Sequence, residues 1–351
     1  MMKNEEKYHV IGLMSGTSLD GVDIAYVEFK FNQKWKFELG VCEMIPYTEE
    51  WRNLLYNLHK QSDKKIQKIN IKYGLFLGKL IKQFIHNNKI QVDFICSHGH
   101  TIFHQPKNKL TLQIGDGQSI ANQTLKKVIC DFRSMDVSLG GQGAPLVPIG
   151  DYLLFENYNY YLNLGGFSNV SYQKNNIRKA YDICPLNIIL NDLARQLGRP
   201  YDKNGEIARK GRRIDSLFHQ LNELSYYSLK APKSLAKEWV EQYINPLLKQ
   251  HSNIPDLLNT FTEHAALQIG KNLQEGSCLI TGGGAFNSYL IERLQSYTKT
   301  DIHLPNKKII EYKEALIFAF LGVLRYRNEI NCLSSVTGAK SDCSGGVIFT
   351  R

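Results

Sequence analysis

The feature that most constrains the fold of this chain is a glycine-rich polar bend between two strand-like apolar runs, which occurs twice. The first bend lies in "GLMSGTSLDGVD" at residues 12–23, where three glycines, three hydroxyls and two carboxylates share twelve positions. A plain hairpin needs only about two to five turn residues. The pattern returns in "YYLNLGGFSNVSYQ" at residues 160–173. This self-similarity predicts two related halves.

The segments around the two bends alternate between strand-like and helical patterns. Apolar runs and period-two alternation predict strands, and apolar spacing of three and four predicts helices. The predicted strands lie at 8–14, 22–30, 36–44, 92–97, 110–114 and 127–132. The predicted helices lie at about 49–60, 64–87, 185–198, 212–224, 253–275, 286–298 and 310–328, with another beginning near Asp116. Strands followed by helices, twice over, predict two α/β domains with a central cleft.

Charge and cysteine content narrow the function classes. The formal net charge is +10, but the lysines are scattered, and no basic stretch is interleaved with stacking aromatic residues. We therefore expect no nucleic-acid partner, although a positive surface attracts anions such as nucleotides. Seven cysteines without a CxxC pair predict buried free thiols in a reducing compartment. No apolar run approaches about 18 residues, so we expect a cytoplasmic protein without a membrane span.

The glycine bends have the composition of anion sites. Backbone N–H groups in such a turn can surround an anion, and Ser15, Thr17 and Ser18 add donors. Asp20 and Asp23 could order Mg²⁺ through its water shell. The turns "NLGGFSN" and "TGGGAFN" at 281–287 supply further glycines, and three glycine turns fit a nucleotide site. Each turn taken alone is also explained by a polar hairpin or tight packing, and the P-loop spacing is absent.

Nine segments carry a resemblance to a known family. The order of the glycine turns looks like the superfamily of sugar kinases, heat-shock ATPases and actin. The closer resemblance is to the 1,6-anhydro-N-acetylmuramic acid kinase family, and it runs in order from about residue 9 to residue 348. The segments are "GLMSGTSLDGVD", "SHGHTIFHQP", "TLQIGDGQSIA", "DFRSMDVSLGGQGAPLVP", "LNLGGFSNVS", "GRPYDKNGEIARKG", "APKS", "TGGGAFN" and "SVTGA".

This resemblance implies a fold, a reaction and partners. The fold would be two related actin-like ATPase (ribonuclease H-like) domains, 1–140 and 141–351, with the final helix packing back on the first. The enzyme would use ATP, Mg²⁺ and water to open the 1,6-anhydro ring of anhydro-N-acetylmuramic acid and phosphorylate its 6-oxygen, as a cytoplasmic homodimer in cell-wall recycling. The implied ATP-binding residues are Gly16, Thr17, Ser18, Leu19, Asp20, Gly21, Val22, Asp23, Gly165, Gly166, Gly282, Gly283 and Gly284, with Asp20 also holding Mg²⁺ through water.

The resemblance also assigns the general base and residues near the sugar. The family motif "DTGPGN" aligns with "DICPLN", which carries the base over to Asp182, whereas composition alone favours a helix cap there. Ile183, Cys184 and Leu186 depart from the family pattern, which places the sugar specificity in question. The implied substrate-binding residues are His98, Asp116, Arg133 and Glu314, and Arg133 would pair with the lactyl carboxylate of the sugar.

Purely structural explanations also exist for the residues assigned to the substrate. A surface ion pair explains Arg133 equally well, and placement at a helix start explains Glu314. A zinc site in "CSHGHTIFHQ" is disfavoured because no second ligand cluster is evident. Two alternative functions stay open: a related amino-sugar kinase with shifted specificity, and a non-catalytic sensor of nucleotide or sugar.

Overall fold

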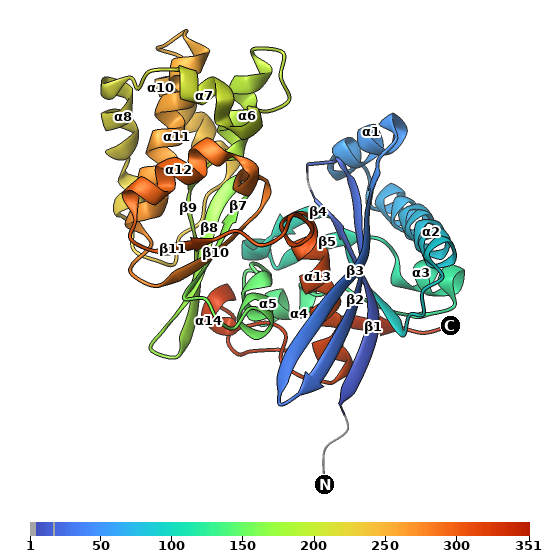
Figure 1. Cartoon of the computed structure of the whole chain (residues 1–351). Helices are drawn as coiled ribbons and strands as arrows, with labels where there is room; N and C mark the ends of the chain where they lie inside the picture. The colour runs from blue at the N-terminus through green and yellow to red at the C-terminus, as the bar shows by residue number, and fades with distance from the viewer. Residues whose placement is uncertain (1–4, 17) are drawn as a thin grey trace. The chain divides into compact units, whose positions relative to one another are not determined.

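The computed structural model describes residues 5–16 and 18–351, and the chain divides into two compact units. The first unit comprises two segments, the chain up to Glu156 and the segment Tyr312–Arg351. The second unit comprises Asn157–Glu311. Each unit is built on its own β-sheet (Figure 1). The predicted α/β class is confirmed.

The first unit contains a seven-stranded mixed sheet in the order β12-β6-β4-β1-β2-β3, with β5 paired to β4. Its strands are β1 (Glu6–Ser15), β2 (Gly21–Asn32), β3 (Lys34–Pro46), β4 (Phe94–Gln105), β5 (Leu110–Ile114), β6 (Lys127–Cys130) and β12 (Val347–Phe349). Its helices are α1 (Glu49–Asn57), α2 (Asp63–Asn88), α3 (Gly117–Thr124), α4 (Ser134–Ser138), α5 (Val147–Leu154), α14 (Ser334–Thr337) and α13 (Lys307–Tyr326) from Tyr312 onward.

The second unit contains a five-stranded sheet in the order β11-β10-β7-β8-β9. Its strands are β7 (Tyr160–Leu164), β8 (Phe167–Lys174), β9 (Ile177–Pro185), β10 (Ser277–Thr281) and β11 (Asp301–His303). Its helices are α6 (Asn187–Arg195), α7 (Glu206–Lys210), α8 (Asp215–Asn222), α9 (Lys237–Trp239), α10 (Asn245–Leu248), α11 (Ile254–Lys271) and α12 (Ser288–Tyr297), with a π-helical turn η5 (Val240–Ile244).

The two sheets repeat one topology. In the first unit β1 pairs antiparallel with β2, β2 antiparallel with β3, β1 parallel with β4, and β4 parallel with β6. In the second unit β7, β8, β9, β10 and β11 take the same places with the same directions. The two halves suggested by the repeated glycine bend are therefore present, and each bend follows the first strand of its sheet.

Alternating side chains place two apolar cores on the faces of the first sheet. Ile11 and Leu13 of β1 join the core that includes α2, whereas Val10 joins the core of α5 and α13, as a period of two requires. Ile149 of α5 lies in the same core as the apolar run 315–321 of α13. This packing explains why the first unit extends to Glu156 and also includes the segment from Tyr312 onward. The sequence had predicted a domain boundary at residue 140.

Helix α13 approaches the sheet closely at Gly12. A Cβ atom at this position would lie 1.9 Å from the carbonyl oxygen of Ala315, which belongs to the backbone of α13. We expect Gly12→Ala to lower the free energy of unfolding by about 1–3 kcal/mol, because the helix must shift to make room. Chemical denaturation measures this change. Gly166→Ala is the control, since nothing lies within 4 Å of a Cβ atom there. An equal loss in both variants would contradict the close-approach explanation.

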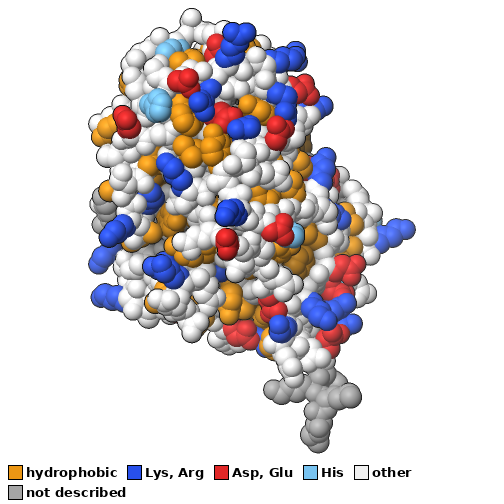
Figure 2. Space-filling model, turned by 60° about the vertical axis from the view of Figure 1, so that its left-hand side comes forward, with side chains coloured by type: hydrophobic (Ala, Val, Ile, Leu, Met, Phe, Trp, Pro, Cys, Tyr) orange, Lys and Arg blue, Asp and Glu red, His pale blue; other side chains and the backbone are white. Residues whose placement is uncertain are grey.

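Two surface properties bear on the partner predictions. No helix in the described part of the chain is both long and apolar enough to cross a membrane. Figure 2 shows one face of the molecule, where Lys and Arg side chains are spread among acidic and neutral ones rather than gathered in one patch.

Candidate active site

The first glycine bend joins β1 to β2 in the first unit. Thr17 lies outside the described residues, and the bend from Gly16 to Asp20 is closed by a hydrogen bond from the Leu19 N–H to the Gly16 carbonyl (3.3 Å). Leu19 has a φ of 61°, in the left-handed region that side chains other than glycine seldom adopt. The side chains of Ser18 and Asp20 are exposed, so both are available to a ligand. Gly21, Val22 and Asp23 already belong to β2.

A buried chain of hydrogen bonds fixes the base of this bend. The Ser15 hydroxyl lies 2.6 Å from the Tyr47 hydroxyl and 3.0 Å from Nδ1 of His100, and Tyr47 in turn contacts the Tyr73 hydroxyl. Burial lowers the pKa of His100 to about 4, so this ring is neutral near pH 7. Ser15 is therefore held by the protein itself, and the sequence-based suggestion that it donates to an anion has no support in this geometry.

His98 and Arg133 form the central polar contact of the first unit. His98 lies on β4 and Arg133 follows β6, and the parallel pairing of these strands brings both to one edge of the sheet. Nε and Nη2 of Arg133 donate to Nε2 of His98 at 3.1 and 2.8 Å, and Nδ1 of His98 lies 2.9 Å from the Gly99 carbonyl. Burial and the adjacent guanidinium hold the pKa of His98 well below its usual value. The ring is therefore neutral, with the proton on Nδ1.

Arg133 retains free donors. Its guanidinium has five N–H groups: two point at His98, and a third, on Nη1, donates to the Gly143 carbonyl at 2.6 Å. The other two N–H groups have no acceptor among the described residues and are available to a ligand. Burial lowers the pKa of Arg133 to about 10, partly offset by the nearby Glu314 carboxylate, so the group is charged at neutral pH. The Glu314 side chain lies on α13 and reaches the surface, and partial burial among its neighbours raises the pKa of its carboxyl group.

Asp116 is a helix cap that also borders a recess. Its Oδ2 accepts from the Ser119 N–H (2.7 Å) and hydroxyl (2.6 Å) at the start of α3, which alone accounts for an acid here. The recess has a volume of about 180 Å³, and His98, Gly115 and Asp131 line it together with Asp116. The structure thus brings His98 and Asp116 to one recess and His98 to Arg133.

The other two glycine turns lie side by side in the second unit. They follow β7 and β10, which are parallel neighbours with Asn163 opposite Thr281. A Cβ atom on Gly282 would lie 2.5 Å from Oδ1 of Asn163, and Gly282 has a φ of 83°, so only glycine fits there. The carbonyls of Gly165 and Gly166 accept N–H bonds from residues 186–188 at the start of α6.

The N–H groups of the Gly165–Gly166 turn remain open. No acceptor in the described part of the chain bonds either N–H group. Gly283, in the neighbouring turn, is exposed. Unpaired backbone donors beside a glycine turn are the groups that bind phosphate oxygens.

Asp182 lies inside strand β9, opposite Asn169 of β8, so the helix-cap interpretation is wrong. Helix α6 begins instead after Leu186, without a side-chain cap. Oδ2 of Asp182 accepts from the Leu235 N–H at 2.9 Å, and the Tyr226 hydroxyl donates to the Asp182 carbonyl at 2.7 Å.

The other carboxylate oxygen of Asp182 is available. Oδ1 has no hydrogen-bond partner among the described residues. The side chain is half-buried, and burial raises its pKa, with the Leu235 N–H opposing the shift. A held carboxylate with one open oxygen and a raised pKa has the properties of a general base.

The three departures from the family pattern turn out to be core residues. Ile183, Cys184 and Leu186 are each 0% exposed and belong to the core of the second unit. The Cys184 thiol contacts the Ser168 hydroxyl at 3.1 Å, and burial raises its pKa to about 12, which makes it an inert thiol. Leu186 packs behind the third turn, where a Cβ atom on Gly284 would lie 3.2 Å from Cδ2 of Leu186.

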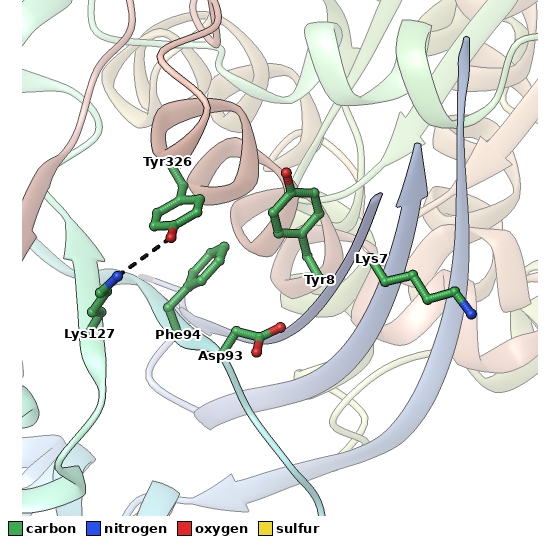
Figure 3. A pocket seen from close by; sticks show the side chains of 6 residues that line it. All are labelled: Lys7, Tyr8, Asp93, Phe94, Lys127 and Tyr326. Carbon is green, nitrogen blue, oxygen red and sulfur yellow. Dashed lines mark hydrogen bonds between the residues drawn. The ribbon is translucent and has the colours of Figure 1, made fainter. Parts of the chain in front are cut away.

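A second recess, of about 310 Å³, contains none of the predicted site residues. Lys7, Tyr8, Asp93, Phe94, Lys127 and Tyr326 line it (Figure 3). It lies at the amino ends of β1, β4 and β6, whereas the polar residues described above follow the carboxyl ends. Because ligands of open α/β sheets bind outside the carboxyl ends of the strands, this recess is not the candidate active site.

Sequence reasoning missed the residues that support the site from a distance in the chain. Tyr47 and Tyr73 carried no motif, and Leu235 contributes only a backbone N–H. The one available signal was the "APKS" segment, one of those that carry the family resemblance. It includes Lys233, whose carbonyl accepts from the Asp182 N–H at 3.2 Å.

Comparisons with known proteins point to one family over nearly the whole length of this chain. Residues 8–351 match the family model described as anhydro-N-acetylmuramic acid kinase. A protein of that name from Bacillus thuringiensis subsp. konkukian is 34% identical, over 97% of this chain and 99% of its own. A protein of the same name from Pasteurella multocida is also 34% identical, over 100% of this chain and 98% of its own.

A solved structure gives only a distant likeness. It is an activator of 2-hydroxyisocaproyl-CoA dehydratase from Clostridium difficile with bound ADPNP, 13% identical, which covers 91% of this chain and 97% of its own at a TM-score of 0.43. At that TM-score the likeness supports no inference about this chain.

Proposed function

The chain belongs to the anhydro-N-acetylmuramic acid kinase family, and from this premise we propose that it transfers the γ-phosphate of ATP to the 6-oxygen of anhydro-N-acetylmuramic acid while water opens the 1,6-anhydro ring. The products are N-acetylmuramic acid 6-phosphate and ADP. The chain is accordingly a phosphotransferase.

The observation that carries the proposed mechanism is the geometry of Asp182. Opening the ring requires water to attack the anomeric carbon, and a carboxylate that takes its proton accelerates that attack. The Leu235 N–H fixes Oδ2 at 2.9 Å and leaves Oδ1 to receive the proton. The raised pKa of Asp182 makes its carboxylate a stronger base than an exposed one.

Phosphate binding is assigned to the glycine turns. The open N–H groups of Gly165 and Gly166 suit the negative charge of the phosphates, which grows on the transferring group. Gly282, Gly283 and Gly284 offer a flat backbone to the ribose or base. The first bend, Gly16–Asp23, is proposed to contact the phosphates as well. When bound, Mg²⁺ neutralises phosphate charge, and the exposed oxygens of Asp20 suit its water shell.

Recognition of the sugar is assigned to the first unit. The two free N–H groups of Arg133 match a carboxylate in a bidentate pair, and the lactyl group of muramic acid carries one. His98 orients this guanidinium and stays neutral, so it does not compete for the anion. Asp116 and Glu314 are proposed to bond sugar hydroxyl or amide groups.

A coupled assay with ATP and several amino sugars tests the function. We expect ADP formation with anhydro-N-acetylmuramic acid and phosphate on the 6-oxygen of the opened sugar. Turnover only with other sugars would favour a kinase of shifted specificity, and binding without turnover would favour a sensor. Because Ile183, Cys184 and Leu186 are buried, their side chains give no support to the shifted-specificity alternative.

Three further parts of the proposal follow from the family alone. They are a homodimeric assembly, a cytoplasmic location and a role in recycling of the cell wall. Light scattering of the purified protein tests the first, and a monomeric mass at working concentration would remove it.

A further inference from the structure

Two cysteines near the end of the chain face one another in the first unit. The Cys332 N–H donates to the Cys343 carbonyl and the Cys343 N–H to the Cys332 carbonyl, both at 3.1 Å, in an isolated antiparallel bridge. Opposite residues that exchange both bonds have Cα atoms about 5.5 Å apart. Disulfides span Cα distances of about 4.4–6.8 Å. The backbone is therefore already placed for a disulfide.

The two thiols also lie close together beside a buried carboxylate. Both Sγ atoms and an oxygen of Asp136 lie within 4.8 Å of one another. The Cys332 thiol donates to Oδ1 of Asp136 at 3.1 Å. The adjacent Cys332 thiol lowers the pKa of Cys343. Cys343 is also the more exposed of the two, at 7% against 2%. Cys343 is therefore the nucleophile of the pair.

We propose that Cys332 and Cys343 form a reversible disulfide in exchange with a low-molecular-weight disulfide, and that this bond weakens binding of the sugar. The Cys343 thiolate attacks one sulfur of the small disulfide and releases the first thiolate. Cys332 gives up its proton and attacks Sγ of Cys343, which releases the second. The protein loses two electrons and two protons, and the small disulfide gains both as two thiols.

The link to the sugar passes through Asp136. This 0%-exposed carboxylate also accepts from the Thr337 hydroxyl (2.6 Å) and the Gly143 N–H (2.7 Å). The Gly143 carbonyl accepts from Arg133. Oxidation removes the Cys332 donor from Asp136. Because a buried carboxylate that loses a donor is destabilised, Asp136 shifts toward its remaining donors, Thr337 and Gly143. The effect on the sugar rests on the proposed function, whereas formation of the disulfide does not.

A metal ion is the competing occupant of this cluster. Asp136, Cys332 and Cys343 are the one group of three metal-ligating side chains found together in the described part of the chain. Oδ1 of Asp136 already accepts from Cys332 and Thr337, and Oδ2 accepts from Gly143. A metal would have to displace or compete with these donors, whereas a disulfide uses only the two thiols. The geometry therefore favours the disulfide.

The chemical test uses the full chain treated with glutathione disulfide under native conditions. Free thiols are then alkylated and peptides mapped by mass spectrometry. We expect a peptide joining Cys332 to Cys343, its loss in Cys332→Ala and in Cys343→Ala, and its persistence in Cys42→Ala, which removes the one thiol that is not buried. Separate alkylation of Cys332 and Cys343 in the treated, folded protein would overturn the proposal. So would stoichiometric Zn²⁺ binding that needs both thiols and blocks the cross-link.

The kinetic test compares reduced and oxidised protein. We expect oxidation to raise KM for the sugar about tenfold, as weakening one hydrogen bond to a charged group would, with KM for ATP unchanged and full reversal by a reductant. A cross-linked protein with unaltered KM would refute the coupling. Absence of kinase activity in the reduced protein would instead refute the proposed function and leave the mapping result standing.

Discussion

Asp182→Asn is expected to lower kcat by roughly 10²-fold or more, the usual contribution of a positioned base. Asparagine has nearly the same shape, and its amide oxygen can still accept from the Leu235 N–H, so the second unit should keep its fold. What the variant lacks is an atom able to take the proton of the attacking water. Steady-state kinetics with saturating ATP measure the loss, and calorimetric titration with an ATP analogue should give an unchanged Kd.

The matched control is Asp192→Asn, an identical change at an exposed position on α6 of the same unit. This variant should turn over like the parent. If Asp182→Asn retained the parental kcat, Asp182 would lose its assigned role.

The pH profile provides an independent check on the same residue. Burial raises the pKa of Asp182 above the ordinary aspartate value of about 3.9. The base works only when deprotonated, so kcat should fall as the pH drops through this raised pKa. The acid limb of the profile should therefore lie at a higher pH than an ordinary aspartate would give. The residual activity of Asp182→Asn should lack that limb. An identical limb in both proteins would assign it to another group.

Arg133→Ala is expected to raise KM for anhydro-N-acetylmuramic acid by about 10- to 100-fold, since a hydrogen bond to a charged group contributes about 1.5–3 kcal/mol. The physical reason is the loss of the two free N–H donors that fit a carboxylate. KM for ATP should change little. Arg133→Lys keeps the charge but not the planar fork, so its KM should lie between those of the parent and Arg133→Ala.

A sugar without the lactyl group separates recognition from structure. The parent enzyme should discriminate between anhydro-N-acetylmuramic acid and anhydro-N-acetylglucosamine through kcat/KM, and Arg133→Ala should remove most of this preference. If Arg133 had only a structural role, its replacement by alanine would lower kcat/KM for both sugars alike. Undiminished preference in the variant would therefore contradict its assignment to the carboxylate.

Much of the fold was predictable because its signals are local. The glycine bends, the strand at 110–114 and the helix near 254–271 each depend on residues that are neighbours in the chain. The segment from Ser225 to Leu248 was left without a prediction, and it forms short 3₁₀, π and α turns whose apolar residues join the core of the second unit. Such turns follow from tertiary packing, which periodicity does not reveal.

The candidate site was predictable only where side chains themselves carry the chemistry. His98 and Arg133 were named from motifs, and they contact one another. The residues that hold Arg133 and Asp182 were not predicted, because Gly143 and Leu235 contribute only backbone atoms, and any residue type supplies those. Tyr47 and Ser15 meet across 32 residues, and a single sequence contains no signal for that pairing.

One structure would test the central claim most directly: the protein crystallised with a non-hydrolysable ATP analogue and anhydro-N-acetylmuramic acid. We predict phosphate oxygens on the N–H groups of Gly165 and Gly166, and a water about 2.6–3.2 Å from Oδ1 of Asp182 that faces the anomeric carbon. A nucleotide bound away from those glycines, or a bound sugar whose anomeric carbon is out of reach of Asp182, would contradict the account.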